Sequence, residues 1–175
     1  MRNIQYSLDA IVWSKFYTGI HFNMVYYSII LDEYIHNVFT IVLPFVRVMH
    51  WGLPMGIFIG PYVLQEKMSN LFQDVVHACI CMDDLVIVRN NVFQNHVYIL
   101  DEVLNWLEKP VMQVNAVKYE WDHNSVSYLG FVVMLEKIKP HPFKVESITV
   151  LEPPKKQIQI IYFIEMVNLY HYLWK

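Results

Sequence analysis

Two adjacent carboxylates, Asp83 and Asp84, are the residues whose type and spacing point most directly to chemistry. Carboxylate oxygens are the ligands that Mg²⁺ prefers, and a pair of them can hold the ion against the phosphates of a substrate. Such a pair is also common in exposed turns, where aspartate is an ordinary residue. The pair alone therefore fits either a metal site or a solvated turn.

Apolar residues flank this pair on both sides. Residues 75–82 read as an apolar strand and residues 85–88 as a second one, which predicts a hairpin with both carboxylates at its turn. Strands of this composition belong to a core, so the hairpin would present charge at the edge of that core. This context favours a site over a loose loop.

His77, Cys79 and Cys81 offer a second set of ligands, suited to a soft metal such as zinc. Alternate residues of a strand lie roughly 6.6 Å apart, whereas two sulfurs on one zinc ion lie less than about 4 Å apart. The spacing does not fit one tetrahedral site. We expect the cysteines to be small buried side chains without a disulfide, which predicts a reducing compartment.

The elements that must position these groups are a mixture of helices and strands. Residues 93–107 have apolar positions at helical spacing (Phe93, Val97, Leu100, Leu104 and Leu107), and Pro110 follows them. Residues 125–133 and 137–139 predict a strand and its return strand, and helices are expected from about residue 144 and over 157–174. Strands and crossover helices do not alternate regularly, which predicts an α+β fold.

Composition limits the function further. The 175 residues are 55% hydrophobic and only 17% charged, which excludes a disordered chain. The net charge of −3 provides no global positive field for nucleic acid. The aromatic residues near the amino end (Phe16, Tyr17, Phe22, Tyr26 and Tyr27) could stack on bases, although core packing is their commoner role.

Residues 48–65 contain no charged side chain, and Gly52, Gly56 and Gly60 are spaced four apart, as in packed transmembrane helices. Pro54 and Pro61 interrupt the stretch, which barely reaches the length of a membrane span. We therefore expect a buried segment rich in turns, and keep a small membrane-associated protein as an alternative.

Together with its neighbours, the carboxylate hairpin resembles the reverse transcriptase of gypsy-type long-terminal-repeat retrotransposons. The likeness is colinear over residues 4–174. Its clearest segments are Phe22-Asn23-Met24-Val25-Tyr26-Tyr27-Ser28, Leu53-Pro54-Met55-Gly56, Cys81-Met82-Asp83-Asp84-Leu85 and Tyr128-Leu129-Gly130. The resemblance implies a polymerase palm with an antiparallel sheet packed on helices and partial fingers (residues 1–140), followed by the start of a thumb (residues 141–175).

The chemistry of that family is the templated addition of deoxynucleotides to a primer 3′-hydroxyl, with two Mg²⁺ ions about 3.5 to 4 Å apart. The resemblance therefore implies Mg²⁺ as cofactor, and an RNA or DNA template with primer and deoxynucleoside triphosphates as partners, with no membrane. It assigns metal binding to Asp83 and Asp84, and an approach to the departing phosphates to Lys118. It assigns nucleotide contacts to Phe22, Tyr26, Met55 and Gly56, and template or primer contacts to Pro61, Gln65, Leu129 and Gly130.

One departure from the family concerns the metal site directly. The family carries a metal-binding aspartate on its first catalytic strand, and His21 stands at that position. Imidazole is a poor ligand for Mg²⁺ and adds no negative charge when neutral. We therefore expect catalysis to be severely impaired.

Other departures replace glycine, and they fit an element copy that has decayed. The positions are Val25, Val46, Val111, Lys137 and Glu165, and Cys81 replaces the hairpin tyrosine. Glycine tolerates positive φ, so we expect side chains at backbone positions that need it. Most of the fingers and any RNase H or integrase part are expected to be missing. A non-catalytic nucleic-acid-binding module remains the other alternative, although phosphate contacts need more Lys and Arg.

Overall fold

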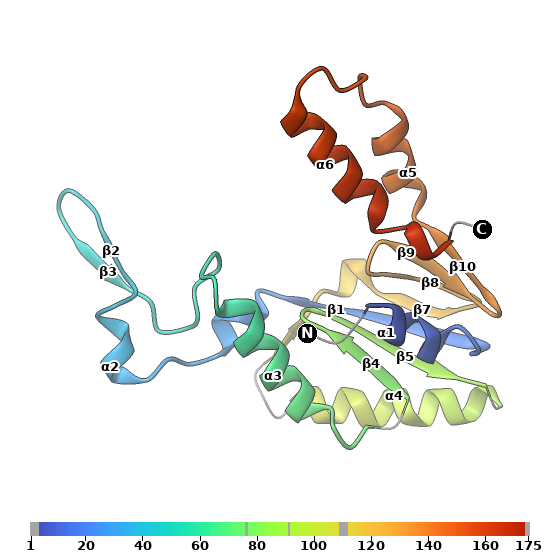
Figure 1. Ribbon diagram of the computed structural model, residues 1–175. Helices are drawn as coiled ribbons and strands as arrows, with labels where there is room; N and C mark the ends of the chain where they lie inside the picture. Colours follow the sequence, from blue (N-terminus) through green and yellow to red (C-terminus); the bar gives the residue numbers. More distant parts are fainter. Residues whose placement is uncertain (1–3, 76, 91, 109–111, 174–175) are drawn as a thin grey trace.

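The computed structural model describes residues 4–75, 77–90, 92–108 and 112–173. Its centre is an antiparallel sheet of five strands in the order β4-β5-β1-β6, with β7 also paired to β1. The strands are β1 (Phe16–Asn23), β4 (Ala78–Cys81), β5 (Asp84–Arg89), β6 (Gln113–Val114) and β7 (Glu120–His123). This arrangement of antiparallel sheet and helices confirms the predicted α+β class (Figure 1).

Two cores cover the two faces of this sheet, because successive side chains of a strand point to opposite faces. Ile20 and Phe22 of β1 pack on one face with the helices α3 (Gly60–Leu71) and α4 (Phe93–Glu108). Tyr17 packs on the other face with α1 (Ile4–Ile11) and with a second sheet. That sheet is formed by β8 (Ser125–Tyr128), β9 (Phe131–Met134) and β10 (Lys137–Pro140).

The turn between β8 and β9 corrects the single strand predicted over 125–133. Leu129 and Gly130 both have positive φ, 52° and 82°, as in the tight hairpin turns that match strand twist. Apolar alternation continues on both sides of this turn, so periodicity alone did not show it. Glycine is well suited to its position here, whereas Leu129 holds a conformation that non-glycine residues adopt less often.

Helix α4 is confirmed, although its buried face differs from the predicted one. Phe93 and Val97 are exposed, whereas His96, Ile99 and Val103 are buried. The difference arises from a polar pair, because His96 Nε2 lies 2.8 Å from Thr18 Oγ1 on β1. A hydrogen-bonded histidine can be buried in a core, and an apolar pattern does not reveal it.

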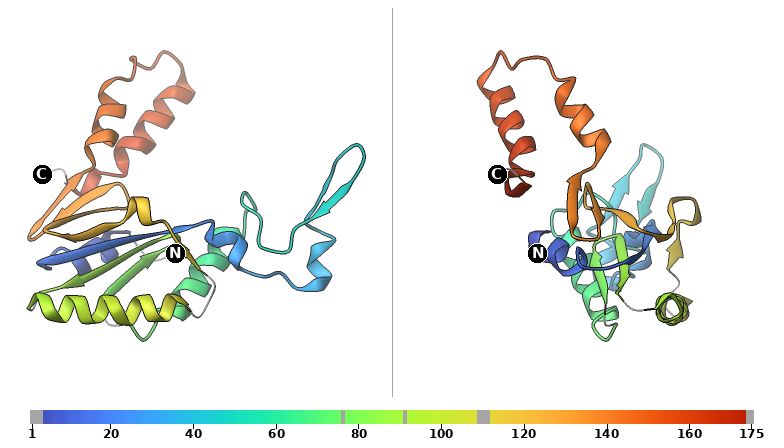
Figure 2. Two further views of the ribbon diagram at one scale, coloured as in Figure 1. Left: turned by 180° about the vertical axis from the view of Figure 1, so that it is seen from behind. Right: turned by 90° about the vertical axis from the view of Figure 1, so that its right-hand side faces the viewer.

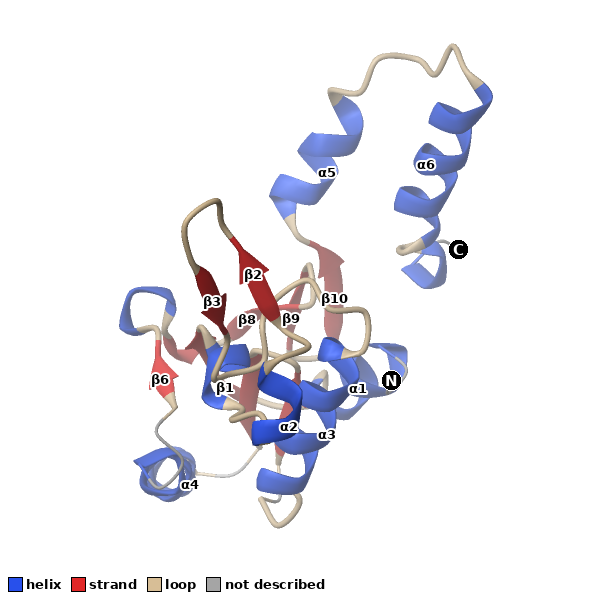
Figure 3. Cartoon of the chain, turned by 90° about the vertical axis from the view of Figure 1, so that its left-hand side faces the viewer, coloured by secondary structure: helices blue, strands red, loops and turns tan. Residues whose placement is uncertain are grey.

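A second region projects from the sheet between β1 and α3 (Figures 1 and 3). It contains η1 (Val25–Ser28), α2 (Glu33–His36), β2 (Thr40–Val42) and β3 (Arg47–Met49), and β2 pairs only with β3 among the described strands. At the base of this region Gly52 forms a bridge with Ile30. Here the backbone carbonyl of Tyr27 lies so close that a Cβ on Gly52 would be 2.3 Å from its oxygen.

The charge-free stretch 48–65 is neither a helix nor buried throughout. Gly60 opens α3, while Gly52 and Gly56 precede it, so the three glycines do not share a helix. Phe58 and Ile59 are exposed, which corrects the expected burial. Within the described residues, no helix is both long and apolar enough to cross a membrane.

The last elements are α5 (Pro142–Thr149), α6 (Gln157–Asn168) and η3 (His171–Leu173), which stand to one side of the sheets (Figure 2). The helix predicted over 157–174 ends at Asn168 in the structure. Residue 174, the last of the predicted range, lies outside the described residues. Tyr170 is buried, and its ring meets the ring of Phe131 at 5.1 Å. The chain therefore returns to the three-stranded sheet after leaving it at β10.

Positive φ occurs beside some of the replaced glycines and not at them. Among the described residues, Met24 and Glu136 have φ of 51° and 58°, whereas Val25, Lys137 and Glu165 are not on the left-handed side. Val46 likewise does not have positive φ, and Val111 lies outside the described residues. The prediction that these replacements fall on positive φ is wrong for the described positions. The residue before Val25 and the residue before Lys137 take the left-handed conformation instead, and Glu165 lies within α6.

Candidate active site

The hairpin of β4 and β5 presents the two carboxylates differently. Cys81 pairs with Asp84 across the hairpin, so its two-residue turn is Met82-Asp83, and Met82 has φ of 54°. Asp83 lies in this turn and is exposed, whereas Asp84 is already the first residue of β5 and is half-buried. The expectation that both lie at the turn is therefore wrong for Asp84, whose direction is set by the sheet.

His21 lies directly opposite Asp84 in the next strand. The antiparallel register pairs His21 of β1 with Asp84 of β5, and His21 Nδ1 lies 2.5 Å from Asp84 Oδ1. Both side chains are 26% exposed. The register thus brings together His21 and Asp84, two residues that lie 63 positions apart in the chain.

The charges around His21 favour its protonated form. The hydrogen bond to Asp84 raises the pKa of His21, and the negative charges of Asp84 and Glu120 act in the same direction, against burial and the positive charge of Lys118. Glu120 comes from β7, and its Oε2 accepts a hydrogen bond from the backbone N–H of Ser127. A protonated His21 neutralises one of the charges that a metal ion would need.

This raised pKa predicts a pH-dependent stability in the presence of a chelator. A group whose pKa is raised by folding stabilises the protein below its unfolded value, 6.5 for histidine, and the stabilisation is lost as the pH rises through the folded value. We expect the difference in urea stability between wild type and His21→Ala to be about 1 kcal/mol at most, the scale of partly exposed pairs. It should be largest below pH 6.5 and shrink above it. A difference that grows with pH would contradict this prediction.

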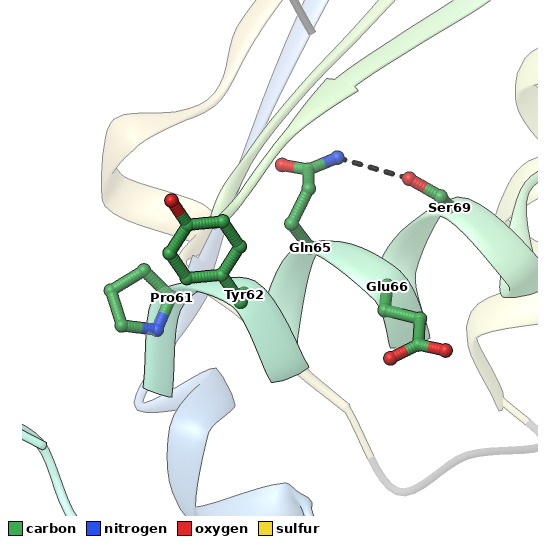
Figure 4. Close-up of a pocket in the computed structure, with 5 residues that line it drawn as sticks. All are labelled: Pro61, Tyr62, Gln65, Glu66 and Ser69. Carbon is green, nitrogen blue, oxygen red and sulfur yellow. Dashed lines mark hydrogen bonds between the residues drawn. The ribbon is translucent and has the colours of Figure 1, made fainter. Parts of the chain in front are cut away.

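Gln65 of α3 fixes the turn of the hairpin. Its Oε1 accepts a 2.8 Å hydrogen bond from the backbone N–H of Met82, and its Nε2 donates to the backbone carbonyl of Ile80 at 3.4 Å and to Ser69 Oγ at 3.1 Å (Figure 4). The side chain therefore ties α3 to the residues beside Asp83. Sequence reasoning placed Gln65 on the template-facing surface and missed this contact, because the residues are 17 positions apart.

We expect Gln65→Leu to destabilise the hairpin by about 1–3 kcal/mol, because it leaves the half-buried N–H of Met82 without its acceptor. Urea unfolding measures the loss, and hydrogen exchange at the Met82 amide locates it. The matched control is Gln73→Leu, because Gln73 is exposed just beyond the same helix, and it should change stability by less than about 0.5 kcal/mol. Unchanged exchange at Met82 would show that the contact does not hold the turn.

Phe22 and Tyr26 reach the site in different ways. The Phe22 ring is buried and packs against Phe72 at 6.3 Å, so its side chain is unavailable to a nucleotide, which corrects the sequence assignment. Its backbone N–H instead donates to the carbonyl of Asp83 at 2.9 Å. Tyr26 is half-buried, and burial together with the charge of Asp83 raises its pKa.

The remaining predicted residues lie around this centre. Lys118 is exposed at the end of η2 (Ala116–Lys118), which is tied to β1 because the N–H of Asn115 donates to the carbonyl of His21 at 2.8 Å. Met55 and Gly56 lie exposed in the loop before α3. Pro61 lines a cavity of about 290 Å³ together with Tyr62, Gln65, Glu66 and Ser69 (Figure 4). Leu129 and Gly130 form a turn in the other sheet.

The half-buried state of Cys81 also differs from its expected burial. Burial and the negative charges of Asp84 and Asp83 raise the pKa of its thiol. Cys79 is likewise half-buried, and neither cysteine forms a disulfide. A thiol with a raised pKa is a weak nucleophile and a weak metal ligand, because the thiolate is the reactive form.

These side chains do not fit a pair of Mg²⁺ ions. Such a pair needs carboxylates from two strands, whereas β1 contributes the imidazole of His21, and the carboxylate of Glu120 already accepts a backbone hydrogen bond. In the part of the chain that the structure describes, no group of three or more His, Cys, Asp or Glu side chains is placed to hold a metal ion.

The sequence is similar to a known protein family and to several relatives. The family model described as reverse transcriptase (RNA-dependent DNA polymerase) matches residues 5–133. The chain is 29% identical over 119 residues to a retrovirus-related Pol polyprotein from transposon opus of Drosophila melanogaster, and 26% identical over 160 residues to that from transposon gypsy of the same organism. These matches cover 67% and 90% of this chain but only 12% and 15% of the relatives.

Solved structures of foamy viral protease-reverse transcriptase have the same fold. The complex with an RNA/DNA hybrid matches 96% of this chain and 23% of that protein, with a TM-score of 0.85 and 15% identity. The dRH form in complex with double-stranded DNA matches 97% of this chain and 30% of that protein, with a TM-score of 0.89 and 15% identity. The predicted polymerase palm is thus confirmed as the fold.

Proposed function

Because the chain belongs to the reverse transcriptase (RNA-dependent DNA polymerase) family and is related to gypsy-type elements, we propose that it is a palm domain with impaired catalysis. In this proposal residues 1–140 are the palm with partial fingers and residues 141–175 begin the thumb. The ancestral reaction is the templated addition of deoxynucleotides to a primer 3′-hydroxyl, for which Mg²⁺ supplies charge stabilisation when bound.

One observation supports the impairment above all others, the 2.5 Å contact between His21 Nδ1 and Asp84 Oδ1. This contact occupies an oxygen that a metal ion would use, and the hydrogen bond raises the pKa of His21, which favours the protonated form that repels a cation. Asp83 remains exposed in the turn, with Gln65 holding the adjacent backbone. The chain thus keeps the contact that holds the turn of the hairpin, but it lacks a carboxylate on β1 opposite Asp84.

Primer extension by the wild-type chain tests this proposal. With Mg²⁺ and an RNA template annealed to a DNA primer, we expect extension at background level. The Asp84→Asn variant is the control, and its rate should equal that of wild type, because a site without function has nothing further to lose. Extension well above background that Asp84→Asn abolishes would overturn the proposal.

A second candidate is a nucleic-acid-binding module without catalysis. The whole chain has a net charge of −3, but residues 137–175 contain six lysines and only three glutamates. Local positive charge of this kind can bind phosphates, and such binding weakens with salt. Binding of an RNA/DNA hybrid that falls steeply between about 50 and 200 mM salt would support this candidate, and no binding at low salt would exclude it.

A further inference from the structure

A cavity of about 480 Å³ lies at the end of β5 that is remote from the candidate active site. Asp84 is the first residue of β5 and Arg89 is the last, so the length of the strand separates the two places. The cavity is lined by Arg89, by Asp74 and Val75 beyond the end of α3, and by residues of α4. Figure 1 shows α4 on the side of the sheet away from α5 and α6. Cavities of this size commonly hold small molecules.

Arg89 reaches this cavity because of its position in the strand. Leu85 and Ile87 belong to the core that contains residues of α3 and α4, and Arg89 follows them at the same spacing of two. Its side chain therefore lies on the same face of the sheet, and its Nε is buried. Among the residues that the structure describes, this Nε has no hydrogen-bond partner and the guanidinium forms no ion pair. Since buried donors in proteins are normally hydrogen-bonded, the guanidinium is suited to an acceptor from a ligand.

Two carboxylates share the cavity with this guanidinium. Asp74 lies in the turn after α3 and Glu102 lies on α4, and both are exposed. Arg89 is the only Lys or Arg in residues 68–108. A phosphate or another simple anion would be repelled by the two carboxylates, whereas a simple cation would be repelled by the guanidinium. The cavity therefore suits a ligand that carries both signs of charge.

The rest of the lining adds apolar surface to the charged groups. One face of α4 lines the cavity with residues spaced by three and four along the helix: Asn95, Tyr98, Ile99 and Glu102. Ile99 is buried, and Val75 beyond α3 is half-buried. Apolar side chains of this kind pack against methylene groups, such as those in the stem of a lysine. The cavity thus favours a ligand whose charged groups are joined by a methylene chain.

We propose that this cavity binds a basic α-amino acid such as lysine or arginine, either free or as the carboxyl-terminal residue of a peptide. Its α-carboxylate accepts hydrogen bonds from Arg89, including one from Nε, and its positive groups pair with Asp74 and Glu102. The free amino acid carries one negative and two positive groups, which match one guanidinium and two carboxylates. This inference is independent of the proposed polymerase ancestry, because it uses none of the residues around Asp84.

The Nε–H group of Arg89 itself reports binding in a ¹⁵N–¹H spectrum of the full chain. The chain contains three arginines, so the variants Arg2→Lys and Arg47→Lys identify the Arg89 signal by elimination. Titration with lysine at constant ionic strength should shift this signal, with saturation below about 10 mM. Lysine amide lacks the carboxylate and norleucine lacks the side-chain cation, so each should bind about tenfold more weakly than lysine.

Variants of the cavity separate the contributions of its charges. Asp74→Asn and Glu102→Gln each remove one negative charge at nearly constant shape, and each should weaken lysine binding about fivefold. Arg89→Met removes the donors, so calorimetry should find that it binds lysine and lysine amide equally. The matched control is Glu146→Gln on α5, which changes the net charge by the same amount away from the cavity lining and should bind as wild type does.

Nα-Acetyl-lysine distinguishes the two sources of the ligand, because its α-nitrogen is blocked as in a peptide. Binding at least as tight as that of lysine assigns the site to the end of a peptide, and weaker binding assigns it to the free amino acid. The proposal is overturned if lysine at about 10 mM leaves the Arg89 signal unshifted, or if lysine amide binds wild type as tightly as lysine does. It is also overturned if Glu146→Gln weakens binding as much as Glu102→Gln does.

Folding does not confuse these measurements, because Asp74 and Glu102 are exposed and circular dichroism should be the same for their variants and for wild type. The test therefore holds even if Arg89→Met does not fold. Primer extension does not enter these measurements, so its failure would leave them unaffected.

Discussion

The His21→Asp variant is expected to extend a primer about 100-fold faster than wild type in Mg²⁺, the scale of one lost electrostatic contact to a reacting centre. The substitution places a carboxylate opposite Asp84, so that two strands each supply an anionic ligand. A single-nucleotide extension assay under single-turnover conditions measures the rate. The expected change is large because the wild-type rate is expected to be at background.

Two controls separate this restored charge from other effects of the substitution. His21→Asn also removes the imidazole but adds no charge, so its extension should stay at background. In a chelator, His21→Asp should be less stable than wild type, because two carboxylates would repel each other where the wild type has the 2.5 Å hydrogen bond between His21 and Asp84. Mg²⁺ should stabilise His21→Asp and leave wild type unchanged, since a ligand stabilises only a state that binds it. Equal extension by His21→Asp and His21→Asn would refute the role given to His21.

The Gly52→Ala variant is expected to lose at least about 2 kcal/mol of stability, because its methyl group has no room. A Cβ at Gly52 would lie 2.3 Å from the carbonyl oxygen of Tyr27 and 2.8 Å from its Cα, and backbone atoms cannot swing away as side-chain atoms can. The same segment is held by 2.9 Å hydrogen bonds from Leu53 N–H to Ile29 and from Leu31 N–H to Trp51. Urea unfolding measures the loss.

Gly60→Ala is the matched control for this prediction. Its Cβ would meet the Tyr26 ring at 3.5 Å, an ordinary contact, and alanine favours a helix over glycine by roughly 0.5–1 kcal/mol. Gly60→Ala should therefore be neutral or slightly stabilising. Equal destabilisation by both substitutions would show that the close approach of Gly52 and Tyr27 does not govern stability.

Local patterns predicted the elements well, whereas contacts between distant elements escaped them. The helix over residues 93–107 and the carboxylate hairpin follow from apolar spacing and from the adjacent aspartates. The buried pair of Thr18 and His96 joins residues 78 positions apart, so no local pattern contains it. The family resemblance assigned Gln65 to the template-facing surface, which stays a prediction, and its hydrogen bond to Met82 depends on how α3 crosses the hairpin.

In the charge-free stretch 48–65, a local pattern predicted a structure that the chain does not form. Its three glycines, spaced by four, have the pattern of a packed membrane helix, yet each does something different in the fold. Gly52 allows two backbones to approach, Gly60 opens α3, and Gly56 lies exposed in the loop between them. A spacing of four places glycines on one helix face only where the whole segment is helical. Here Pro54 and Pro61 prevent a continuous helix over residues 52–60.

The return of the chain at Tyr170 restricts how α5 and α6 can move. The segment is attached through β10, where α5 begins, and through Tyr170, which packs on Phe131 after the end of α6. Ile148 of α5 and Leu173 pack on the same core. Removal of the Tyr170 ring should therefore loosen the end of α6, while β10 and Ile148 still hold the start of the segment on the sheet.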